Sequence, residues 1–93
     1  MPKFMIEREI AGAGKMSPED LQQAAQLSNS VLHKLGPDIQ WIHSYVAGDK
    51  IYCIYAAPSE ELIKKHSELS GFPADKITRV AAVIDPTTAE SGK

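Results

Sequence analysis

The sequence has little cysteine and no long apolar run. Cys53 is the only cysteine among 93 residues, so neither an intramolecular disulfide nor a cysteine-rich zinc site can form within one chain. We expect Cys53 to be a small buried hydrophobic residue in a strand. No apolar run approaches the roughly 20 residues that a membrane-spanning helix needs, and the N-terminal MPKFMIERE lacks the apolar stretch of a signal peptide. We therefore expect a cytoplasmic protein with no membrane partner.

The sequence also lacks an excess of positive charge. Ten Lys and Arg residues stand against twelve Asp and Glu residues, and the densest basic cluster is the pair Lys64 and Lys65. Proteins that bind nucleic acid usually carry a basic patch, so we expect no nucleic-acid partner.

A chain of this length has enough residues for one core only. We expect a single domain over residues 1–85, followed by a flexible polar tail over residues 86–93.

Hydrophobic periodicity predicts four strands. Residues 3–10 alternate with period two, and the segment KITRVAAVI, residues 76–84, is typical of a last strand. Residues 39–47 and 50–57 are two further strand-like runs around a Gly-Asp pair. Such a pair favours a tight hairpin, because Gly can take the positive φ that the turn demands.

Two helices are predicted between these strands. The segment SPED places Ser17 at a helix N-cap and Pro18 at the first helical position, and apolar residues at spacings of three and four then continue to Gly36. Ser59 can cap a second helix that runs to about Ser70. The order strand, helix, strand, strand, helix, strand is the βαββαβ arrangement of ferredoxin-like α+β proteins, in which two helices cover one face of a four-stranded antiparallel sheet.

Alternation along the central hairpin predicts an aromatic face that the helices leave uncovered. With a two-residue loop, this helix-free face carries Trp41, His43, Tyr45 and Tyr52. The face under the helices then carries Ile42, Val46, Ile51 and Cys53. An aromatic patch of this size is too large to leave in water on a small monomer. We therefore expect a homodimer that packs two such faces together, as in dimeric α/β barrels.

His43 is the most informative polar residue, because it interrupts this aromatic face. If the first strand turns Glu7 to the same face, the imidazole and the carboxylate would suit Ni, Zn or Cu, or would serve as an acid/base pair. The alternative is that His43 is a hydrogen-bonded residue of the dimer interface. The aromatic residues of this face also have two possible roles. They would either pack in the dimer interface or line a pocket for an organic ligand; they are Trp41, Tyr45 and Tyr52.

His66 lies on the apolar stripe of the second predicted helix, where it is either a satisfied, half-buried side chain or a ligand. His43 and His66 would lie on opposite sides of the sheet, so they could share a site only at a sheet edge or across a dimer.

No H-x-x-H, H-E-x-x-H or H-x-H spacing is present. Ser44 and His43 cannot pair as nucleophile and base, because neighbours in a strand point to opposite faces. No catalytic arrangement can be read from the spacing alone, so an enzyme is the less expected class.

Four segments of the sequence carry a resemblance to a known family: KFMIERE, IQWIHSYV, KIYCIYAAPSEELIKKHSELSGFPADKI and VIDPTTAE. Together they resemble a widespread bacterial family of small ferredoxin-like proteins, long catalogued as a domain of unknown function and often labelled nickel-binding. The most specific block runs from Trp41 to Pro73. The resemblance implies a dimeric protein that binds a divalent metal ion, with nickel as the named ion, for sequestration or sensing. By position, it implies His43 and His66 as metal ligands with Glu7 as their carboxylate partner.

A function of another class remains open beside metal binding. The chain could be a small-ligand protein or an enzyme similar to dimeric α/β barrel monooxygenases, with its pocket near Tyr45, Tyr52 and His43. A deep apolar cavity with converging polar groups would favour this alternative.

Overall fold

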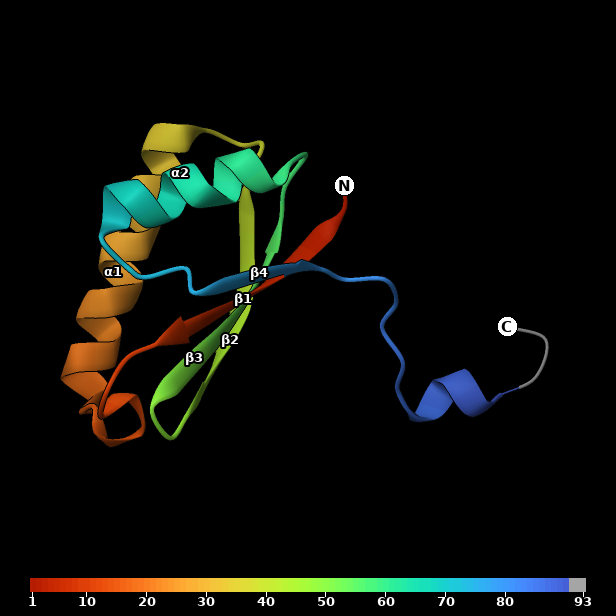
Figure 1. Ribbon diagram of the computed structural model, residues 1–93, viewed down its shortest axis with the longest axis horizontal. Coiled ribbons are helices and arrows are strands. Elements are labelled where there is room, and N and C mark those ends of the chain that lie inside the picture. Colours follow the sequence, from red (N-terminus) through yellow and green to blue (C-terminus); the bar gives the residue numbers. More distant parts are fainter. Residues whose placement is uncertain (91–93) are drawn as a thin grey trace.

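The computed structural model describes residues 1–90, and its elements follow the predicted order. The four strands are β1 (Lys3–Glu9), β2 (Gln40–Ala47), β3 (Lys50–Ala56) and β4 (Lys76–Arg79). They form one antiparallel sheet in the order β2-β3-β1-β4. The helices α1 (Pro18–Leu35) and α2 (Glu60–Ser70) both lie on one side of this sheet (Figure 1). The ferredoxin-like βαββαβ fold predicted from the sequence is therefore confirmed.

The helix ends are set by the residues that the sequence indicated. The Ser17 hydroxyl accepts a hydrogen bond from the backbone N–H of Asp20 at 3.1 Å, and Pro18 begins α1. Gly71 ends α2 with φ of 79°, a left-handed conformation that glycine adopts without strain. Over residues 1–90, neither helix is both long and apolar enough to cross a membrane.

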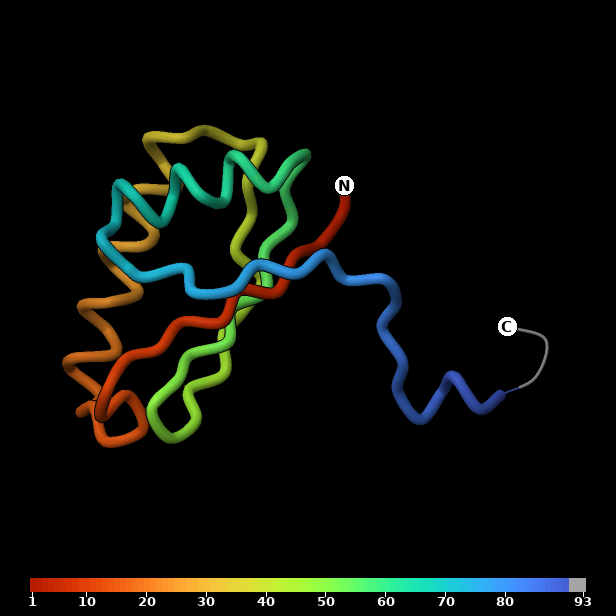
Figure 2. Tube along the Cα trace, viewed as in Figure 1, coloured from red at the N-terminus to blue at the C-terminus, as the bar shows by residue number. Residues whose placement is uncertain are grey.

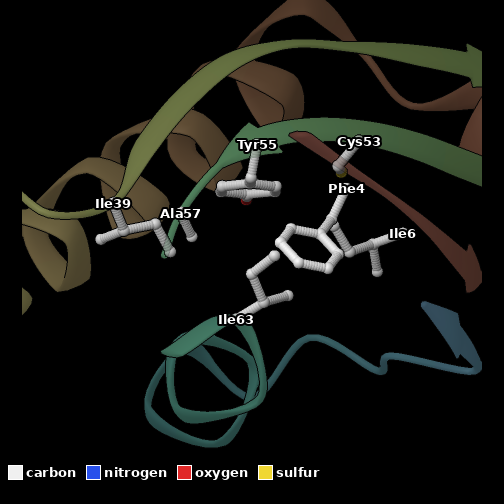
Figure 3. Close-up of a cluster of buried hydrophobic side chains, with 7 residues drawn as sticks. All are labelled: Phe4, Ile6, Ile39, Cys53, Tyr55, Ala57 and Ile63. Atoms are coloured by element: carbon white, nitrogen blue, oxygen red, sulfur yellow. The ribbon is translucent and has the colours of Figure 1, made fainter. Parts of the chain in front are cut away.

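The hydrophobic core lies between the sheet and the helices. Ile63 of α2 has no exposed surface and points toward Phe4 and Ile6 of β1 (Figure 3). Cys53 and Tyr55 of β3 complete the centre of this cluster. Cys53 is a buried free thiol, as predicted. The core therefore fixes α2 onto the two central strands, β1 and β3.

A β-bulge in β2 changes which face Trp41 occupies. His43 pairs with Ile54 as predicted, but the bulge between Trp41 and His43 inserts Ile42 as an extra residue, so Trp41 pairs with Tyr55. Because side chains alternate along a strand, one inserted residue reverses the face of everything beyond it. The prediction that Trp41 shares the face of His43 is therefore wrong, and Trp41 lies on the side that the helices cover. Ile42, predicted to lie under the helices, is 43% exposed.

Strand β4 ends at Arg79 rather than at the predicted Ile84. The backbone N–H of Val80 donates to the carbonyl of Lys3 at 2.9 Å, and Lys3 is the first residue of β1. Beyond this bond, β1 offers no further residue for pairing, so the chain leaves the sheet (Figure 2). It continues through the short 3₁₀ helix η2 (Pro86–Ala89), where Asp85 and Thr88 form a capping box. The rest of the predicted tail, residues 91–93, lies outside the described residues.

Candidate functional site

The helix-free face of the sheet carries His43 and three of its predicted neighbours. Glu7, Tyr52 and Tyr45 lie opposite one another across strands β1, β3 and β2. His43 is exposed, and its ring meets the ring of Tyr45 edge-on, with 5.0 Å between centroids. Tyr45 is itself 60% exposed. Of the aromatic face predicted from the sequence, the structure thus retains His43, Tyr45 and Tyr52.

The Glu7 carboxylate is held by a weak ion pair on this face. Lys50 Nζ lies 3.8 Å from Glu7 Oε1 and 4.0 Å from Glu9 Oε1. The Lys50 side chain is 40% exposed, so water screens these interactions and they contribute little to stability. Because Lys50 is loosely held, another cation can replace it beside Glu7 without a large energetic penalty.

His66 lies on the other side of the sheet, buried between the two helices. Its ring has no exposed surface, its Nε2 is 3.2 Å from the Ser28 hydroxyl of α1, and its centroid is 5.2 Å from the Tyr55 ring. Within residues 1–90, its Nδ1 has no hydrogen-bond partner. Burial lowers the pKa of His66, and the positive charge of Arg8 lowers it further. The imidazole is therefore neutral at pH 7.

Arg8 is a buried cation that the sequence analysis did not single out. Only 2% of its surface is exposed, and its Nη1 donates to the Ser67 hydroxyl at 3.1 Å and to the Pro73 carbonyl at 2.7 Å. Its Nε lies 3.4 Å from Cys53 Sγ. The signal was present in the period-two pattern of β1, where Arg8 alternates in phase with Phe4 and Ile6. An Arg in phase with core residues must reach polar partners inside the fold.

A cavity of about 90 Å³ adjoins Arg8 under the helices. Its wall includes Trp41, Tyr55 and Cys53. The indole N–H of Trp41 donates a hydrogen bond to the Ser44 hydroxyl at 2.9 Å. Neither Tyr45 nor Tyr52 lines it. This cavity therefore lies on the opposite side of the sheet from the organic-ligand pocket that the sequence left open.

Within one chain, the structure does not bring the predicted metal ligands together. His43 and Glu7 lie on the helix-free face, whereas His66 lies between the helices on the covered side. Across residues 1–90, no group of three or more His, Cys, Asp or Glu side chains converges on a point that could hold a metal ion. The roles of His43, Glu7 and His66 as ligands stay predictions.

The strand order and the two covering helices define a small α+β protein of the ferredoxin-like class. Residues 4–80 match the family described as "Nickel responsive protein SCO4226-like", and the chain belongs to this SCO4226-like family. The solved structure of SCO4226 from Streptomyces coelicolor A3(2) is similar, with a TM-score of 0.74 and 25% identity over 88% of this chain and 99% of that one. No curated protein matches the chain. The resemblance seen in the sequence is confirmed.

Proposed function

We propose that this protein binds a divalent transition metal ion, nickel first among them, on the helix-free face of its sheet. The observation that carries the proposal is the exposed imidazole of His43 on the same face as Glu7, whose carboxylate has only a weak, displaceable partner. An imidazole and a carboxylate are suitable ligands for nickel and its neighbours in the first transition row. The family description, nickel responsive, supports the same ion.

The metal site we propose is completed by a second copy of the chain. Of the predicted ligands, one chain supplies one imidazole, His43, and one carboxylate, Glu7, on this face, which is too few for a stable site. Packing two helix-free faces together would double both ligands and would cover Tyr45 and Met5, which are 60% and 39% exposed. His66 lies outside this proposed site, because its ring is enclosed by the fold.

Such a site suits sequestration or sensing rather than turnover. A metal ion that needs ligands from two chains binds the dimer and not the monomer, so it stabilises the dimer increasingly as the free metal concentration rises above the dissociation constant. Metal concentration would therefore set the extent of assembly. We propose the cytoplasm as the location, since a reducing compartment keeps a free thiol such as Cys53 reduced.

Replacing His43 by alanine tests the proposed ligand. We expect the affinity for Ni²⁺ to fall by more than about tenfold, because loss of a direct ligand should exceed the effect of losing a supporting partner. Calorimetric titration of the metal-free protein measures this change. His33→Ala is the matched control, since it removes another exposed imidazole from helix α1 and should leave the affinity unchanged.

Two results would contradict the assignment. Equal affinities of the wild type and the His43→Ala variant would remove His43 from the site. Equal losses in the His43→Ala and His33→Ala variants would mean that nickel binds exposed imidazoles without a defined site. A folded His66→Gln variant tests the remaining prediction, since reduced affinity there would assign His66 as a ligand.

A further inference from the structure

Arg8 is buried without a carboxylate partner. The guanidinium group of an arginine is always charged in proteins. Among residues 1–90, every ion pair is formed by Lys50 or Lys64, so no Asp or Glu oxygen lies within 4.0 Å of the Arg8 guanidinium. Its partners are neutral: a hydroxyl, a backbone carbonyl and the face of Phe72, whose ring centroid is 5.8 Å from Cζ. In the same part of the chain, its Nη2 is buried and has no hydrogen-bond partner. A buried positive charge normally requires a compensating negative one.

The space for that negative charge is the cavity of about 90 Å³ that Arg8 lines. Its wall is otherwise mostly apolar and includes Ile10, Leu21, Ala24, Ala25, Ile51 and Phe72. Leu21 and Val46, which also line the cavity, are 36% and 40% exposed, so its mouth lies between α1 and the β2–β3 hairpin. This mouth is the route by which a small molecule would enter the cavity.

Few other polar groups face this cavity, and most are already engaged. The Trp41 indole N–H donates to Ser44, and the Ser28 hydroxyl is in contact with His66. Burial raises the pKa of the Tyr55 phenol. The neighbouring Ser28 and Arg8 side chains lower it and so oppose part of this shift. Besides the engaged groups, a ligand would therefore meet one cation, Arg8, and one phenol, Tyr55, with apolar side chains around them.

We propose that this cavity binds a small monocarboxylate, with its carboxylate beside the Arg8 guanidinium and its alkyl group among the apolar side chains of α1 and β3. A planar carboxylate matches the guanidinium fork, and its single charge neutralises that of Arg8. A phosphate dianion would bring a second negative charge into an apolar cavity, where it would have no partner. The site lies on the opposite side of the sheet from the proposed metal ligands and does not depend on them.

The volume limits the length of the ligand. A cavity of 150 Å³ holds benzene, which gives roughly 25 Å³ per heavy atom, so the buried part of the ligand has about four heavy atoms. Acetate and propionate have this size. Longer alkyl chains would extend toward the mouth at Leu21 and Val46.

Titration of the full chain with sodium propionate tests the proposal. Trp41 is the only tryptophan and lines the cavity, so its fluorescence and its indole N–H resonance report directly on occupancy. We expect a saturable response in about the millimolar range, because so few heavy atoms limit the affinity. Sodium chloride at equal ionic strength and the neutral propionamide should give no saturable response. If the cavity holds only water, propionate will give no saturable response, and that result would overturn the proposal.

Two variants and one control locate the binding. Arg8→Met keeps the apolar stem of the side chain but removes the charged guanidinium, and it should weaken propionate binding by at least about tenfold. Ala24→Leu fills the cavity while keeping Arg8, so it should abolish the response even if the Arg8 variant does not fold. Gln26→Leu adds the same side chain on the exposed side of α1 and should bind like the wild type. Unchanged propionate binding in Ala24→Leu would show that the ligand lies elsewhere and would overturn the assignment.

Discussion

Replacing Ile63 by alanine is expected to lower the free energy of unfolding by about 2–5 kcal/mol, the range for truncating a large aliphatic residue in a packed core. Ile63 has no exposed surface and belongs to the cluster that joins α2 to strands β1 and β3 (Figure 3). Its loss removes buried methyl groups and leaves a void that the rigid sheet cannot close. Urea unfolding followed by circular dichroism measures the change.

Leu69 provides the matched control on the same helix. It is 52% exposed, so Leu69→Ala removes a side chain of similar size with little loss of burial and should change the free energy of unfolding by less than about 1 kcal/mol. Similar effects of the two substitutions would contradict the placement of α2, because they would mean that the face carrying Ile63 is not the face packed on the sheet.

Acidification below about pH 6.5 is expected to destabilise the protein through His66. Burial and the charge of Arg8 lower the pKa of His66 in the folded state below its usual value of 6.5. Above pH 6.5 the imidazole is neutral in both states, so its contribution is fully present. Below it, the unfolded chain takes up a proton that the folded chain excludes, and stability falls by up to about 1.4 kcal/mol per pH unit until the folded pKa is reached.

The variant His66→Gln separates this effect from other titrations. Glutamine can still hydrogen-bond to Ser28, which lies 3.2 Å from the ring in the wild type, but it cannot take up a proton in this range. Urea unfolding at pH 7, 6 and 5 should therefore show a smaller pH dependence in the variant than in the wild type. The same slope in both proteins would show that His66 is not the titrating group.

The sequence predicts most of the fold because its local signals agree with one another. The SPED segment, the glycines at the helix ends and the period of the apolar residues all point to the observed elements. The end of β4 escapes prediction because it depends on where its neighbour β1 begins, and the residues beyond Arg79 remain strand-like in composition. The length of a strand depends on both of the strands that pair, whereas the hydrophobic periodicity of a segment describes only that segment.

The candidate site is less predictable, for two different reasons. The bulge beside Trp41 carries no compositional mark, yet it moves the only tryptophan from the helix-free face to the cavity. Arg8 was visible in the alternation of β1, but a charged residue in phase with the core is ordinarily read as an edge effect rather than as a buried cation. Its partners, Ser67 and Pro73, lie far along the chain and become neighbours only through the fold.

Titration of the metal-free protein with Ni²⁺ by calorimetry, with the mass in solution measured in parallel, tests the proposed function most directly. We predict tight, saturable binding at a fixed ratio of nickel to dimer. Weak binding without saturation by an intact, folded protein would contradict the metal assignment. Binding at a fixed ratio to a monomer would contradict the shared site between two helix-free faces.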